Sequence, residues 1–255
     1  MSNLFSVENK RVLVTGGSRG IGKMIATGYV KAGAKVYISS RKKQDCDETA
    51  KELAKFGACV SIPGDISSID GISALVQEIV DRESQLEILV NNAGASWGAM
   101  FKEYPESGFD KVMDTNVKGI FYLTRELMPL LEKAASPGDP ARVINIGSID
   151  GIKVPAMENY AYSASKAAVH HMTKVLAIEL AKSNITCNAI APGPFESKMT
   201  KEMMNSFKDL IIARCPLKRI GNPEDMAGIA IFLGSRAASY MNGVIIPVDG
   251  GICLT

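Results

Sequence analysis

Short apolar runs alternate along the chain with longer segments whose apolar residues recur every three to four positions. The short runs predict strands because they are rich in β-branched residues, whereas the longer periodic segments predict helices. The predicted strands are residues 11–15, 35–39, 58–62, 86–90, 143–146, 185–190 and 243–248. The predicted helices start with residues 20–32 and continue with residues 44–56, 68–83, 109–133, 160–181 and 196–214, and with a last helix opened by Asn222.

This alternation runs without a linker or an internal repeat, so it predicts one α/β domain over residues 1–255. The sheet is expected to be parallel and doubly wound, with about seven strands and with helices on both faces. In such sheets, ligands bind beyond the carboxyl ends of the strands. The residues that follow each predicted strand are therefore the candidates for a site.

A glycine-rich turn, residues 16–22, joins the first predicted strand to the first predicted helix. Backbone amides at a helix N-terminus face an anion, and glycines allow it to approach closely. The turn therefore predicts a phosphate-binding site for a dinucleotide, with a plain tight turn as the alternative. The candidate contacts in it are Gly16, Ser18, Arg19, Gly20, Ile21 and Gly22.

The residues at the end of the second predicted strand indicate whether the dinucleotide carries a 2′-hydroxyl or a 2′-phosphate on its ribose. An acidic residue there would hold the ribose 2′-hydroxyl of NAD, but residues 39–44 contain none and include Ser40, Arg41, Lys42 and Lys43. With Arg19, the basic side chains predict a pocket for a 2′-phosphate, and hence NADPH. Lys42 and Lys43 are equally well explained as a solvated helix start.

Tyr162 and Lys166 lie four residues apart in the helix predicted for residues 160–181, so they share one face. A nearby lysine cation is expected to lower the pKa of the tyrosine, toward the range useful for proton transfer. Tyr160 has no such partner, because Ala164 stands four residues after it. Ser148 follows the strand at residues 143–146 and is expected to bind a substrate carbonyl there.

Two further segments are interpreted from position and pattern. Asn92 and Gly94 follow the fourth predicted strand, where a turn is the simpler reading. Residues 194–218 are predicted to form a helical substrate lid, because a stripe of apolar residues follows a strand of the candidate site. A stripe of this kind also occurs on ordinary core helices. Its members are Met199, Met203, Phe207, Leu210 and Ile211.

Composition narrows the class of protein. The 255 residues carry a formal net charge of +2, which gives no reason to expect a nucleic-acid or membrane partner. No run is long and apolar enough to suggest a membrane span, and no signal sequence is recognised at the start. The five cysteines show no paired spacing, which favours a cytoplasmic protein with reduced thiols. The adjacent His170 and His171 are interpreted as helix surface or interface residues, and no metal site is expected.

Taken together, these motifs resemble the short-chain dehydrogenase/reductase family, whose members have a single Rossmann-type domain. The resemblance covers roughly residues 8–253. It implies that Tyr162 is the proton donor in ketone reduction and that Lys166 lowers its pKa and holds the nicotinamide ribose. It further implies that Ser148 binds the carbonyl oxygen and that Asn116 positions a water in a proton relay. The cofactor contacts implied are Arg19, Arg41, Asp65, Ile66, Asn92, Gly94, Pro192, Gly193 and Ser197.

Within the family, the chain is most similar to 3-oxoacyl thioester reductases, especially the type associated with rhamnolipid synthesis, through residues 91–99 and 141–166. Fatty-acid-synthesis reductases carry an arginine that helps to dock the acyl carrier protein, and this chain has Ile178 there. Carrier protein, coenzyme A thioester and free ketone therefore stay open as substrates. The resemblance also implies a homotetramer. The alternatives are a dehydrogenase of another secondary alcohol, a sugar or a polycyclic, and a nucleotide-binding scaffold without turnover.

Overall fold

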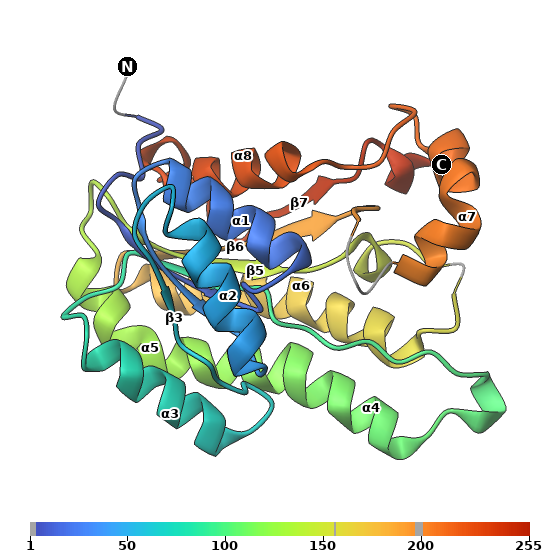
Figure 1. Ribbon diagram of the computed structural model, residues 1–255, viewed down its shortest axis with the longest axis horizontal. Helices are drawn as coiled ribbons and strands as arrows, with labels where there is room; N and C mark the ends of the chain where they lie inside the picture. Colours follow the sequence, from blue (N-terminus) through green and yellow to red (C-terminus); the bar gives the residue numbers. More distant parts are fainter. Residues whose placement is uncertain (1–3, 156, 197–200) are drawn as a thin grey trace.

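A seven-stranded parallel sheet forms the centre of the protein, seen in a computed structural model that describes residues 4–155, 157–196 and 201–255 (Figure 1). The strands lie in the order β3-β2-β1-β4-β5-β6-β7, so the order reverses between β1 and β4. That reversal is the point at which doubly wound sheets bind ligands. The strands are β1 (Arg11–Thr15), β2 (Lys35–Ser39), β3 (Cys59–Ser61), β4 (Ile88–Asn91), β5 (Ala141–Ile146), β6 (Ile185–Pro192) and β7 (Ile245–Val248).

Helices cover both faces of the sheet (Figure 1), which confirms the predicted fold class. Helices α1, α2 and α8 pack on one face, and α3, α5 and α6 pack on the other. The strands are almost wholly apolar because both faces are buried. The helices are α1 (Gly20–Lys31), α2 (Lys43–Leu53), α3 (Ile69–Val80), α4 (Glu106–Met113), α5 (Gly119–Ala134), α6 (Tyr160–Ala181), α7 (Lys201–Arg214) and α8 (Pro223–Gly234).

The segment predicted as one long helix, residues 109–133, is interrupted in the structure. A π-helical turn, η2 (Asp114–Lys118), separates α4 from α5. There the backbone N–H of Gly119 donates to the carbonyl of Asp114, five residues earlier. Nothing in the local sequence signals this turn, and it places Asn116 in the interior.

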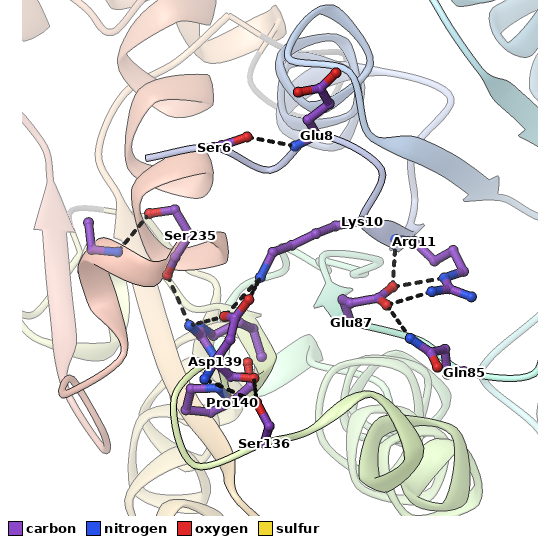
Figure 2. A network of polar contacts seen from close by, with 12 residues as sticks. Ser6, Glu8, Lys10, Arg11, Gln85, Glu87, Ser136, Asp139, Pro140 and Ser235 are labelled. Atoms are coloured by element: carbon purple, nitrogen blue, oxygen red, sulfur yellow. Dashed lines mark hydrogen bonds and ion pairs between the residues drawn. The ribbon is translucent and has the colours of Figure 1, made fainter. Parts of the chain in front are cut away.

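The amino-terminal edge of the sheet is held by a polar network (Figure 2). Lys10 forms an ion pair with Asp139 at 2.8 Å, and Arg11 forms one with Glu87 at 2.8 Å. Arg142, in β5, is only 1% exposed and donates to Asp139 over 3.1 Å and to the Ser235 carbonyl over 3.0 Å. These bonds join the start of β5 to three other segments at the edge opposite the candidate site.

Candidate active site

Tyr162 and Lys166 lie one turn apart on α6, as predicted. Lys166 Nζ lies 5.5 Å from the centre of the Tyr162 ring. It donates over 2.7 Å to the carbonyl of Ile146, the last residue of β5. Lys166 is only 4% exposed. Its ammonium group is thus buried between the helix and the carboxyl end of the sheet.

Ser148 lies two residues beyond β5, at the start of the 3₁₀ turn η3 (Ile149–Gly151). Its Oγ accepts from the backbone N–H of Asp150 over 3.1 Å. Its side chain also interacts with that of Tyr162 and acts to lower the pKa of that phenol. The two side chains therefore approach each other beyond β5, although Ser148 precedes the 149–159 loop and Tyr162 follows it.

The electrostatic expectation for this pair is wrong for the protein on its own. Burial raises the pKa of Tyr162 to about 12, the side chain of Ser148 opposes that rise, and Asp150 adds to it. Burial also lowers the pKa of Lys166 to about 8, against the influence of Asp150. Removal of water from both groups outweighs their mutual effect, because each is enclosed by the protein.

Asn116 is completely buried, with its side chain held by three hydrogen bonds. Its Oδ1 accepts from the backbone N–H of Ala95 over 2.7 Å, and its Nδ2 donates to the Ala95 carbonyl and to Ser165 Oγ, each over 2.9 Å. Asn116 thereby joins the segment after β4 to α6. Its role in a water relay stays a prediction.

Gly94 keeps a space open beside these groups. A Cβ placed on it would lie 3.4 Å from Asn116 Oδ1 and 3.8 Å from Lys166 Nζ. A side chain longer than a methyl would enter the gap between them. The described chain thus brings Asn116, Lys166 and Gly94 together.

The ends of β1 and β4 are joined by Thr15, which the sequence analysis missed. Its Oγ1 accepts from the backbone N–H groups of Asn92 and Ala93, each over 3.0 Å. Asn92 Nδ2 in turn donates to the Thr15 carbonyl over 2.8 Å. A Cβ on Gly22 would lie 2.3 Å from both this Nδ2 and the Gly16 carbonyl oxygen. Only glycine therefore fits where the turn meets Asn92.

The glycine turn itself has the backbone that a phosphate cradle requires. Gly16 and Gly20 have φ angles of 65° and 51°, which disfavour other residues. The Ser18 carbonyl accepts from Thr49 Oγ1 over 2.9 Å, so α2 holds the turn in place. Ile21 packs on the core below. The turn leads directly into α1, as the dinucleotide interpretation demands.

The basic residues beside the turn are exposed. Arg19 and Arg41 both face solvent. Neither has an ion-pair partner within the part of the chain that the structure describes, whereas Lys43 is paired with Asp47 at 2.9 Å. Ser40 Oγ donates to a carbonyl of its own turn over 3.4 Å. The two arginines are therefore available for an anion, and Lys43 is explained by its own helix.

Asp65 and Ile66 follow β3 and differ in exposure. Asp65 Oδ1 accepts from the backbone N–H and the hydroxyl of Ser67, over 3.0 and 2.8 Å. Ile66 is buried, and a Cβ on Gly119 would lie 2.4 Å from its carbonyl oxygen. Both residues lie at the carboxyl edge, where contact with adenine stays a prediction.

Pro192 ends β6, and Gly193 follows it closely against the end of β7. A Cβ on Gly193 would lie 2.7 Å from Asp249 Cα.

Of the predicted lid, Ser197 and Met199 lie outside the described residues. Helix α7 is present, and its Phe207 and Leu210 are at least half exposed instead of forming a core.

Exposed apolar side chains gather on the segments that follow β4, β5 and β6. We call this set the apolar rim. In Figure 1, the 3₁₀ turn η1 (Phe101–Glu103), which follows β4, and helix α7 extend beyond the carboxyl edge of the sheet. Phe101 packs edge-on against Tyr160 at 5.6 Å between ring centres. The rim consists of Met100, Phe101, Ile152, Val154, Met157, Phe207 and Leu210.

The interpretation of both histidines as helix surface or interface residues is wrong for His170, which is buried within the fold. It is 7% exposed, and its Nε2 accepts from the backbone N–H of Ser148 over 3.4 Å. His171, one residue later, is exposed. The available signal was spacing, since His170 follows Lys166 by four residues on the same helix face.

The described residues contain no group of three potential ligands suited to a metal ion. Across the same ranges, no helix has the length and apolarity needed to cross a bilayer. The five cysteines are all unpaired.

Comparison with known proteins gives consistent matches over the whole chain. A family model described as "Enoyl-(Acyl carrier protein) reductase" matches residues 16–253. The rhamnolipids biosynthesis 3-oxoacyl-[acyl-carrier-protein] reductase of Pseudomonas aeruginosa is 47% identical over 256 residues, covering 100% of both chains. The 5-keto-D-gluconate 5-reductase of Escherichia coli is 33% identical, covering 99% of this chain and 98% of its own.

A solved structure described as the Pseudomonas aeruginosa RhlG/NADP active-site complex matches with a TM-score of 0.96 and 47% identity, covering 99% of this chain and 100% of its own. The sheet order and the glycine turn agree with a dinucleotide-binding oxidoreductase. The same is true of the Tyr162 and Lys166 pair. This chain belongs to the short-chain dehydrogenase/reductase family.

Proposed function

We propose that the protein reduces a ketone to a secondary alcohol with NADPH, and that its substrate is a 3-oxoacyl thioester, which becomes the 3-hydroxyacyl form. The observation that carries this proposal is the Lys166 ammonium 5.5 Å from the ring of Tyr162, whose hydroxyl interacts with the side chain of Ser148. Two hydroxyl donors beside a cation suit a carbonyl oxygen on which negative charge develops.

The protonation state of Tyr162 is the one that a proton donor requires. With its pKa raised to about 12, Tyr162 holds its proton at neutral pH and can donate it to the carbonyl oxygen. Ser148 would donate a hydrogen bond to the same oxygen and orient the substrate. Lys166, with a pKa of about 8, stays mostly protonated and stabilises the phenolate left after proton transfer.

The chain offers a cradle that fits NADPH. Glycines at 16, 20 and 22 bring the backbone amides of the turn within reach of a diphosphate. The exposed Arg19 and Arg41 suit the 2′-phosphate, and the relative solved with NADP supports this preference. When bound, NADPH supplies the hydride to the carbonyl carbon. Gly94 would leave room for the ribose beside Lys166.

The acyl substrate is favoured by the apolar rim and by the relative named as a 3-oxoacyl reductase. A sugar-like ketone is the second candidate, since a gluconate reductase is 33% identical. Its hydroxyl groups would gain little from side chains such as Val154, which is 90% exposed. The lid role of residues 194–218 belongs to the same proposal.

Carrier, assembly and compartment are proposed from surface features. Ile178 is 75% exposed on α6 and offers no charge for an acidic carrier protein, which leaves coenzyme A thioesters and carrier-bound substrates both in play. Apolar side chains exposed on α5 and α6, such as Phe121 and Val175, suit the homotetramer that the family resemblance implies. Five unpaired cysteines suit the reducing cytoplasm.

Turnover of purified protein tests the substrate class. NADPH oxidation is followed with an acetoacetyl thioester, a longer 3-oxoacyl thioester, a cyclic ketone and a keto-sugar. We expect the thioesters to have the higher kcat/KM. Turnover of only the free ketones or the sugar would keep the mechanism and discard the acyl substrate.

The variant Tyr162→Phe tests the mechanism. It removes the proton donor, so kcat is expected to fall by about 10²–10⁴-fold while NADPH binding is retained. Tyr160→Phe is the matched control, because Tyr160 lies on the same helix and is 41% exposed. Full activity of Tyr162→Phe would exclude the proposed role of Tyr162.

A further inference from the structure

We propose that His170 is a positioning residue. Its neutral imidazole holds Ser148 in the position where the serine hydroxyl would bind the substrate carbonyl. This inference rests on the proposed role of Ser148 as the hydroxyl that binds the substrate carbonyl. In the described part of the chain, His170 forms no hydrogen bond with Tyr162. It acts instead on the backbone of the turn that carries Ser148, by accepting from the Ser148 N–H over 3.4 Å.

The imidazole of His170 packs closely against the backbone that follows β5. A Cβ on Gly147 would lie 2.1 Å from His170 Nε2, so the ring lies directly against the backbone before Ser148. Gly147 is held from its other side, since its N–H donates to the Ile190 carbonyl over 2.7 Å. The segment that carries Ser148 is therefore fixed between β6 and the imidazole.

The His170 ring also interacts with the far end of the same turn, where the backbone of Gly151 acts to raise its pKa. Since Nε2 accepts from the Ser148 N–H, the proton of the neutral imidazole lies on Nδ1, which defines one tautomer. The turn also packs on α6, as a Cβ on Gly151 would lie 2.7 Å from the Lys166 carbonyl carbon.

Tyr162, Lys166 and His170 follow one another at four-residue spacing on one face of α6. The helix thus carries the two ionisable groups of the site, Tyr162 and Lys166. It also carries His170, which positions Ser148. Any rotation or shift of α6 would move all three together with the turn.

The bond to Ser148 exists only while Nε2 carries no proton. Burial, Lys166 and Lys174 lower the pKa of His170, and the backbone of Gly151 opposes them. From the turn, Asp150 also faces this region, where its carboxylate interacts with Lys166. Protonation at low pH would place an N–H against the N–H of Ser148 and release the turn.

Three variants test this inference. His170→Leu removes the acceptor of the Ser148 N–H, His170→Gln keeps one acceptor and one donor but cannot titrate, and His171→Leu is the control on the exposed neighbour. We expect His170→Leu to lower kcat about tenfold, the value of one lost hydrogen bond, without a change in NADPH affinity. His170→Gln should restore most of kcat and flatten the acidic limb of the kcat profile, which lies below the ordinary histidine pKa because the pKa of His170 is lowered.

Amide hydrogen exchange of residues 147–152 gives a readout that does not depend on turnover. It should speed up about tenfold in His170→Leu and stay unchanged in His171→Leu. An unchanged kcat and unchanged exchange in His170→Leu would overturn the inference, as would a wild-type acidic limb in His170→Gln. If the wild type reduces no ketone, the proposed function fails, and the exchange experiment still decides the role of His170.

Discussion

Two buried cations, Arg142 and Lys166, lie at opposite ends of β5 and are bonded in opposite ways. Arg142 lies at the amino end of the strand, where it has a carboxylate partner in Asp139 and donates to the carbonyls of Pro140 and Ser235. Lys166 binds the carbonyl of Ile146 at the carboxyl end over 2.7 Å. Among the described residues, Lys166 forms no ion pair of the kind that Figure 2 shows for Asp139.

The two cations therefore have different roles: the charge of Arg142 stabilises the fold, and the charge of Lys166 serves the site. Arg142 has its charge neutralised within the fold by Asp139, which also pairs with Lys10. Lys166 is bonded to a neutral carbonyl and is influenced by Asp150 without an ion pair, so its charge stays available for a bound ligand and for Tyr162. Burial lowers the pKa of both cations, and at Arg142 the ion pair with Asp139 opposes that fall.

Arg142→Met should give the largest effect on stability. Removing one partner leaves Asp139 beside Lys10 alone and breaks the bonds to two carbonyls, which should cost about 3–5 kcal/mol of unfolding free energy. Urea unfolding measures it. Arg125→Met is the control, because the exposed pair of Arg125 with Glu126 should contribute less than about 1 kcal/mol. An equal loss in both variants would remove the contrast between the two edges.

Lys166→Met should lower activity without lowering stability. Activity is expected to fall at least about 100-fold, because the proton donor loses its supporting charge. Unfolding free energy at neutral pH should not fall, since a buried ammonium with a depressed pKa is removed. In the wild type, stability should rise between about pH 8 and the ordinary lysine value, because the unfolded chain binds the proton that the folded protein has released. Urea unfolding against pH should show that this rise is absent from the variant.

Arg41→Ala should have the smallest effect, and only on a ligand. An exposed arginine without an ion pair in the described chain contributes little to folding, whereas a lost phosphate contact costs about 1.5–3 kcal/mol. NADPH affinity should therefore fall by roughly 10–100-fold with little change in NADH affinity. Lys42→Ala is the matched control. Equal weakening of both cofactors would contradict the predicted 2′-phosphate contact.

The sequence was a reliable guide where period and chemistry agreed. The helix predicted for residues 160–181 has the bounds Tyr160–Ala181, and the side-by-side placement of Tyr162 and Lys166 followed from helical spacing. The strand ends that carry Asn92, Ser148 and Pro192 were likewise found, because each closes an apolar run. Local pattern decides these features, so a sequence displays them directly.

Features decided by distant contacts could not be predicted in this way. His170 was assigned to the surface because its burial depends on Gly147 and the turn after β5, more than 20 residues away. The pKa of Tyr162 was expected to fall, but enclosure by the folded chain raises it. Thr15 looked like the end of a strand, and its joining of β1 to β4 appears only once the two strands are neighbours.

The π-helical turn at Asp114–Lys118 makes the chain one residue longer here than a regular helix would require. Deleting a single residue from it would give a smooth helix with better backbone geometry. It would also rotate everything on one side of the deletion by about 100° relative to the other side. Asn116 would then lose Ala95 and Ser165 together. At this position the site therefore depends on the number of residues in the chain as much as on their identity.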